Sequence, residues 1–103
     1  MPDQELVRAI VLDALGALNQ QRAVADRFSP ARDTIVYGED GALDSLELVT
    51  FIMEVEQRLE ERLGASVALA DDRAVSRRVS PFRSVPSFVD FIVSRLEERA
   101  HGG

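Results

Sequence analysis

The fold is decided by residues 44–64, which read DSLELVTFIMEVEQRLEERLG. The apolar residues in this stretch recur every three or four positions, which is the period of one face of an α-helix. Asp44 is a suitable N-cap, Glu47 three residues later completes a capping box, and Gly64 is well suited to follow a helix end. We therefore predict a helix from Asp44 to about Leu63.

Two apolar stripes run along this predicted helix. The first consists of Leu48, Ile52, Val55 and Leu59, and the second of Leu46, Val49 and Met53. One stripe is enough for a helix in a small bundle. The second stripe has two interpretations: it belongs to the core, or it contacts another molecule.

The chain on either side predicts two more long helices. The first covers about Asp3–Gln20, and the last opens with Ser84 as N-cap and Pro86 in its first turn, where the missing N–H costs nothing. Their apolar faces consist of Val7, Ile10, Val11, Ala14, Leu15 and Leu18 in the first, and Phe88, Val89, Ile92, Val93 and Leu96 in the last.

The connection after the first helix is long. Val24 and Phe28 favour a further turn or two of helix before Pro30 ends it, because the residue before a proline is pushed out of the helical region. The apolar cluster Ile35–Tyr37 is too isolated for a strand, so we expect it to anchor this loop to the core.

The remaining connection, residues 64–84, predicts one short helix at Asp71–Ser76. No segment alternates apolar and polar residues over the length of a strand. The predicted fold class is therefore all-α, a small four-helix bundle with three main helices, one short helix and a long first loop. We expect one domain over 1–103, with a core at about 4–99 and a flexible tail at 100–103.

Composition excludes several kinds of chemistry. The 103 residues include no Cys and no Lys, and His101 is the single histidine. Disulfides, cysteine nucleophiles and lysine Schiff bases are therefore excluded, and a Ser–His–Asp triad or a metal site is not expected. We expect a chain that is not an enzyme.

Charge limits the expected partners. The net charge of −6 argues against nucleic acid and anionic membranes and favours basic partner proteins. The N-terminus is acidic where a signal peptide is basic, and the most apolar stretch, Ala9–Leu18, is far shorter than the roughly 20 residues of a membrane span. We expect a cytoplasmic protein.

Residues 38–49, GEDGALDSLELV, place Asp44-Ser45-Leu46 between a glycine-containing loop and an acidic helix. Taken alone, this pattern is ordinary capping chemistry. Together with the order of helices, the small size, the acidity and the absence of Cys, it resembles the prosthetic-group site of the acyl carrier proteins. The resemblance covers about Leu6–Leu96.

The resemblance implies that Ser45 receives 4′-phosphopantetheine from coenzyme A through a phosphopantetheinyl transferase, with Asp44 beside it where the transferase docks. A stand-alone, monomeric carrier of this kind holds acyl or aminoacyl intermediates as thioesters. It presents them to activating and transfer enzymes with basic docking surfaces, in fatty acid or other lipid metabolism, polyketide synthesis or another specialised pathway.

The resemblance also implies two further sets of residues. Partner binding would involve Leu46, Glu47, Val49, Met53, Glu54 and Glu56. An acyl pocket would be lined by Ile52, Val55, Leu59, Phe82, Phe88 and Ile92, which are otherwise ordinary core residues.

The sequence departs from the fatty-acid carriers in several features: Ala42 stands where many of them have glycine, Leu43 stands where a small residue is common, and the 64–84 connection is longer. Leu43-Asp44-Ser45 is similar to carriers of activated amino acids, so the cargo class stays open. The alternative function is an acidic helical interaction module in which Ser45 is only a helix-capping residue.

Overall fold

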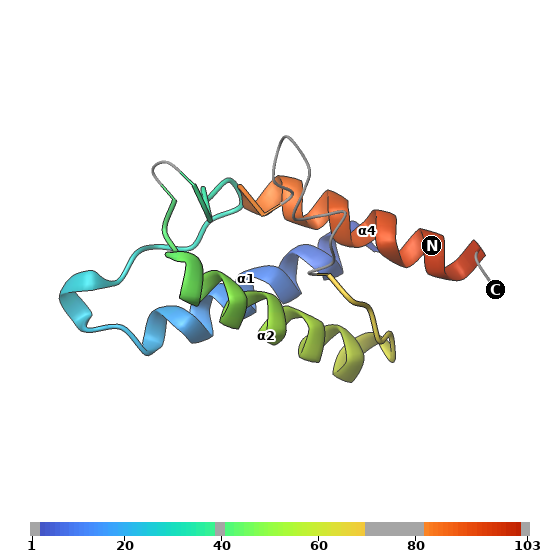
Figure 1. Cartoon of the computed structure of the whole chain (residues 1–103), viewed down its shortest axis with the longest axis horizontal. Coiled ribbons are helices and arrows are strands. Elements are labelled where there is room, and N and C mark those ends of the chain that lie inside the picture. The colour runs from blue at the N-terminus through green and yellow to red at the C-terminus, as the bar shows by residue number, and fades with distance from the viewer. Residues whose placement is uncertain (1–2, 39–40, 70–81, 102–103) are drawn as a thin grey trace.

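Three long helices pack together in this protein. A computed structural model describes residues 3–38, 41–69 and 82–101. Its elements are helix α1 at Gln4–Gln20, a short 3-10 helix η1 at Val24–Asp26, helix α2 at Ser45–Leu63 and helix α4 at Val85–His101 (Figure 1). No strand occurs among these described residues, so the predicted all-α class is confirmed. The predicted short helix at Asp71–Ser76 lies outside them.

Helix α1 begins where the sequence predicts, because Asp3 caps it. The Asp3 carboxylate accepts hydrogen bonds from the backbone N–H groups of Glu5 at 2.9 Å and Leu6 at 3.4 Å. These amides have no partner within the helix, so the cap stabilises its first turn. The buried face consists of the predicted residues Val7, Ile10, Val11, Ala14, Leu15 and Leu18.

The predicted end of this helix at Gln20 is confirmed, and the further turns that Val24 and Phe28 would allow do not form as part of α1. The side-chain amide of Asn19 donates to the Phe28 carbonyl at 2.5 Å and accepts from the Phe28 N–H at 3.0 Å. These bonds return the chain to the last turn of α1. The residues between form η1, which protrudes at one end of the molecule, and Val24 is 77% exposed (Figure 1).

The predicted signals at the end of α2 and the start of α4 are confirmed. Gly64 follows α2 with φ of 65°, a left-handed conformation that glycine adopts without steric cost. At the start of α4, the Ser84 hydroxyl accepts from the Ser87 N–H at 3.3 Å, and the Ser87 hydroxyl accepts from the Ser84 N–H at 3.1 Å. Pro86 lies in this first turn.

The core lies where α1 packs against both α2 and α4. In Figure 1, α1 ends on the side of the molecule where α2 and α4 begin. Aromatic rings join the other two helices: the ring centroids of Phe51 in α2 and Phe88 in α4 are 5.3 Å apart, and those of Phe82 and Phe88 are 5.4 Å apart. All three rings are buried, so they connect α2 directly to α4.

The segment between η1 and α2 is attached to the residues just before α4. Ile35 forms an isolated antiparallel bridge with Ser84, and the Val36 N–H donates to the Arg83 carbonyl at 2.7 Å. The Val36 side chain is fully buried. The prediction that Ile35–Tyr37 anchors the loop to the core is therefore confirmed.

The described residues also bear on two expectations for the whole chain, the absence of a membrane span and the flexible tail at 100–103. Among those residues, no helix is long and apolar enough to cross a membrane. Helix α4 continues to His101, into the segment 100–103 that was expected to form a tail, and residues 102–103 lie outside the described part.

Candidate functional site

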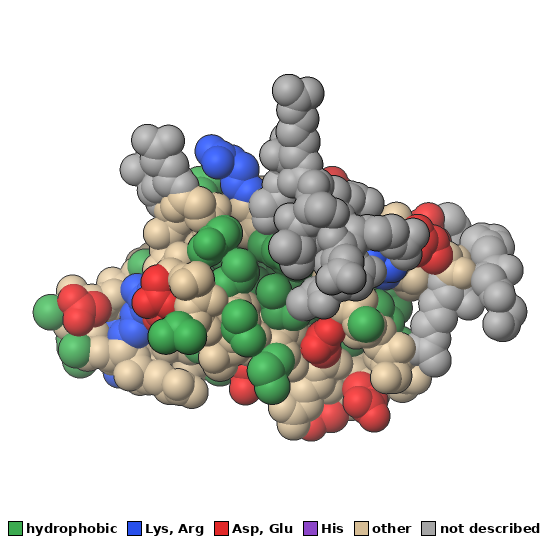
Figure 2. Space-filling view, in the orientation of Figure 1, with side chains coloured by type: hydrophobic (Ala, Val, Ile, Leu, Met, Phe, Trp, Pro, Cys, Tyr) green, Lys and Arg blue, Asp and Glu red, His purple; other side chains and the backbone are tan. Residues whose placement is uncertain are grey.

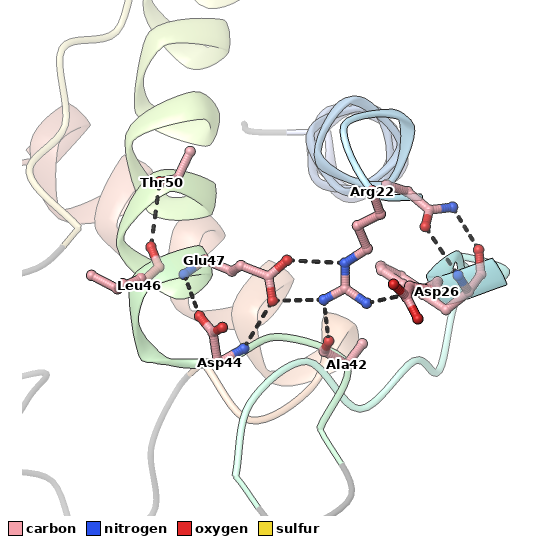
Figure 3. A network of polar contacts seen from close by, with 9 residues as sticks. Arg22, Asp26, Ala42, Asp44, Leu46, Glu47 and Thr50 are labelled. Carbon is pink, nitrogen blue, oxygen red and sulfur yellow. Dashed lines mark hydrogen bonds and ion pairs between the residues drawn. The ribbon is translucent and has the colours of Figure 1, made fainter. Parts of the chain in front are cut away.

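The candidate site lies at the N-terminal end of α2, where a complete capping box starts the helix. Asp44 Oδ1 accepts from the Glu47 N–H at 2.8 Å, and Glu47 Oε1 accepts from the Asp44 N–H at 3.2 Å (Figure 3). The predicted capping roles of Asp44 and Glu47 are confirmed. Because these two side chains complete the box, the start of the helix does not depend on the hydroxyl group of Ser45.

Ser45 is the first residue of α2, and it is exposed. The first amides of a helix have no intrahelical acceptor and carry the positive end of the helix dipole. A negatively charged group attached to the Ser45 hydroxyl would therefore lie in a favourable electrostatic environment. The chain has no Lys, and its one histidine is at the far end of α4, so neither residue type supplies a base beside the hydroxyl.

Arg22, just beyond the end of α1, holds the start of α2. Its Nε donates to Glu47 Oε2 at 2.9 Å, and its Nη2 donates to Glu47 Oε1 at 2.6 Å. Nη2 also donates to the Ala42 carbonyl at 2.6 Å, and Nη1 donates to the Asp26 carbonyl at 3.2 Å (Figure 3). The guanidinium lies 5.1 Å from the centre of the Phe28 ring. One side chain thus joins the end of α1, η1, the segment before α2 and the first turn of α2.

Sequence analysis did not identify Arg22 as part of the site. Arg22 and Glu47 are 25 residues apart, and no periodic or motif signal connects them. The contact depends on the turn that Asn19 makes with Phe28, which redirects the chain after α1. The one sequence hint is a lone arginine at the end of an amphipathic helix, which is too common to single out.

The second apolar stripe of α2 is exposed. Leu46 is 80% exposed, Val49 56% and Met53 62%, so the interpretation of this stripe as core is wrong. The opposite face of α2 supplies the core residues Phe51, Ile52, Val55 and Leu59. Figure 2 shows hydrophobic side chains gathered on the surface of the molecule over α2. Apolar side chains grouped on one exposed face are typical of a contact surface.

The three glutamates predicted for partner binding all have contacts within the chain. Glu47 pairs with Arg22, and Glu54 pairs with Arg58 one turn along the helix. Glu56 Oε2 accepts a hydrogen bond from the Leu69 N–H at 2.7 Å, which attaches the segment after α2 to the helix. The arginines therefore offset part of the negative charge that this face presents.

The six residues predicted for an acyl pocket are all buried in the common core, with exposures from 0% to 5%. The groove beside α2, of about 610 Å³, has a different lining. It consists of Thr50, Met53, Glu54, Glu56, Gln57, Glu60, Ser66, Val67 and Ala68. The structure thus brings the six residues together as packed core, and the pocket stays a prediction.

Comparison with known proteins identifies no family: no protein-family model, no curated protein and no solved structure matches this chain.

Proposed function

We propose that this chain is an acyl carrier protein in which Ser45 is the attachment point of 4′-phosphopantetheine. The observation that carries the proposal is an exposed serine at the first residue of a helix that Asp44 and Glu47 already cap. A hydroxyl group that neither completes the cap nor lies in the core can take a large substituent while the fold stays intact.

The charges around Ser45 fit a phosphodiester. The positive end of the α2 dipole favours an anion at this position. The Glu47 carboxylate two residues along would oppose it, but the bidentate pair with Arg22 offsets that charge. Asp44 remains as the neighbouring acid, and its Oδ1 is directed back to the Glu47 N–H.

The attachment reaction needs only the Ser45 hydroxyl from this chain. Its oxygen forms a bond to the phosphorus of coenzyme A that bears pantetheine. The pyrophosphate bond of coenzyme A breaks, adenosine 3′,5′-bisphosphate leaves, and a base on the transferase takes the hydroxyl proton. Once attached, the group supplies the thiol that the chain lacks, to which acyl or aminoacyl cargo binds as a thioester.

The exposed stripe of α2 supports a docking role beside Ser45. Leu46, Val49 and Met53 form an apolar helix face of the kind that enters grooves on partner proteins, and methionine adapts to surfaces of different shape. The net charge of −6 favours partner enzymes with basic surfaces. The proposal also includes the acyl-carrier type of fold, a monomeric state and a cytoplasmic location.

The test is to incubate the protein with coenzyme A and a broad-specificity phosphopantetheinyl transferase and to record the intact mass. We expect a mass increase equal to one phosphopantetheine, absent in Ser45→Ala and retained in Ser94→Ala, which replaces an exposed serine of α4. Because the chain has no Cys, thiol titration should find about one thiol per modified chain. An unchanged mass, where a known carrier is fully modified, would refute the proposal.

The second candidate is an interaction module that docks through the same exposed stripe and needs no modification. The exposure of Leu46 supports this module as well. The role of Ser45 as the helix cap, which this alternative includes, is wrong because Asp44 is the cap. Modification of Ser45 separates the two functions, and Val49→Ser tests the docking stripe of a carrier. A carrier predicts about a fivefold rise in the transferase KM, from the loss of roughly 1 kcal/mol of apolar burial. Val24→Ser, on exposed η1, is the control.

A further inference from the structure

We propose that the Arg22–Glu47 ion pair positions Ser45 for modification by linking the backbone before the serine to a side chain of the first turn of α2. The inference rests on the proposed function and adds to it a residue from outside the helix that bears the serine. Arg22 touches neither the Ser45 hydroxyl nor the reacting phosphorus, so it is a positioning residue.

Arg22 contacts one residue before Ser45 in the sequence and one residue after it. Its Nη2 donates to the Ala42 carbonyl at 2.6 Å, three residues before the serine, and to Glu47 Oε1 at 2.6 Å, two residues after it. Between these points, Asp44 is fixed by its own N–H bond to Glu47 Oε1 at 3.2 Å. One guanidinium thus binds the backbone carbonyl of Ala42 before the serine and the Glu47 side chain after it, while the Ser45 side chain is exposed (Figure 3).

The pair is stronger than an ordinary surface ion pair. The side chains of Arg22 and Glu47 are 20% and 27% exposed, and two guanidinium nitrogens bind the two carboxylate oxygens. Bidentate pairs of this kind combine charge with a fixed geometry, whereas exposed ion pairs contribute little to stability. The Phe28 ring beside the guanidinium adds a cation–π contact.

The capping box and the ion pair share one carboxylate. Glu47 Oε1 accepts from both Arg22 and the Asp44 N–H. Without Arg22 the Glu47 side chain loses the partner that sets its rotamer, and the Ala42 carbonyl loses its donor. A smaller fraction of the protein molecules then has residues 42–47 in the conformation that a transferase binds. The apparent affinity falls in proportion to that fraction.

The experiment measures KM and kcat of a phosphopantetheinyl transferase with the full chain as substrate. We expect Arg22→Ala and Glu47→Ala each to raise KM about tenfold with kcat nearly unchanged, and the double variant to add little to either. Arg22→Lys keeps the charge without the bidentate geometry, so it should restore part of the loss. The matched control is Arg62→Ala, which breaks an ion pair between α2 and Asp13 of α1, at 2.8 Å, at the opposite end of α2.

A second measurement does not depend on the transferase. In the unmodified protein, the amides of Asp44 and Glu47 should exchange hydrogen faster in Arg22→Ala than in the wild type. If Arg22→Ala does not fold, Arg22→Lys is measured instead, with the same expected result. The amides of Val55 and Leu59, in the middle of α2, should exchange as in the wild type. Local loosening of this kind distinguishes positioning from a general loss of stability.

The outcomes separate this inference from the proposed function. If Glu47→Ala raises KM while Arg22→Ala leaves it within about twofold of wild type, Glu47 acts as a docking charge and positioning is refuted. Equal effects of Arg22→Ala and Arg62→Ala also refute positioning and leave the carrier function standing. A wild-type chain that takes no phosphopantetheine overturns the proposed function, and this inference falls with it.

Discussion

Two glycine-to-alanine substitutions should change the stability of this protein in opposite directions. Gly16 lies within α1, and a Cβ atom built there meets nothing within 4 Å. Alanine is favoured over glycine inside a helix by about 1 kcal/mol, partly because glycine loses more conformational entropy on folding. We therefore expect Gly16→Ala to raise the free energy of unfolding by about 0.5–1 kcal/mol.

Gly41 differs because a Cβ atom there would lie 2.7 Å from the Tyr37 Cα and 2.8 Å from its carbonyl carbon. These are backbone atoms, so no side-chain rotation removes the clash. The nearby bond from the Leu43 N–H to the Val36 carbonyl, at 2.8 Å, would have to shift. Overpacking of this kind costs about 1–3 kcal/mol, which exceeds the entropic gain from alanine in the unfolded chain. We expect Gly41→Ala to lower the free energy of unfolding by about 1–2 kcal/mol.

The assay is urea unfolding followed by far-ultraviolet circular dichroism, which suits a chain without tryptophan whose described elements are helices. A single transition with an unchanged m-value lets the midpoints be compared directly. In thermal unfolding, each kcal/mol corresponds to a Tm shift of about 4–8 °C. The reasoning is refuted if Gly41→Ala is as stable as the wild type, or more stable, while Gly16→Ala stabilises as expected.

Substitutions at three further positions test the core, the cap and the segment after α2. Phe88→Ala removes a fully buried ring that contacts two others, and urea unfolding should show a loss of about 3–5 kcal/mol. Asp44→Ala removes the N-cap of α2 and should cost about 1 kcal/mol in the same assay, whereas Asp44→Asn, which can still cap, should cost less. Glu56→Ala leaves the Leu69 N–H without its acceptor, so hydrogen exchange at that amide should become markedly faster.

The helix boundaries could be predicted because the groups that set them are close in sequence. Asp3 bonds to the amides of the next turn, Asp44 and Glu47 bond to each other, and Gly64 takes a left-handed conformation by itself. Each of these interactions spans four residues or fewer. Capping preferences measured in isolated helices therefore transfer to this chain.

The orientation of α2 could not be predicted in the same way. Both apolar stripes satisfy the helical period, so the sequence alone does not decide which stripe faces the core. The structure decides it through Phe51, which belongs to neither predicted stripe and packs against Phe88 of α4. That contact joins distant parts of the chain, as does the Arg22–Glu47 pair. Neither leaves a periodic signal.

The bridge between Ile35 and Ser84 has a consequence for the order of events during protein synthesis. Helices α1 and α2 are specified locally and can begin to form as they leave the ribosome. The segment that leads into Ser45 receives its support from Arg83 and Ser84 only after the start of α4 has been made. Under the proposed function, we expect nascent chains that stop before Phe82 to be poor substrates for the transferase, and chains that extend through α4 to be good ones. On the proposed function, the Ser45 site is complete only once the start of α4 has been made.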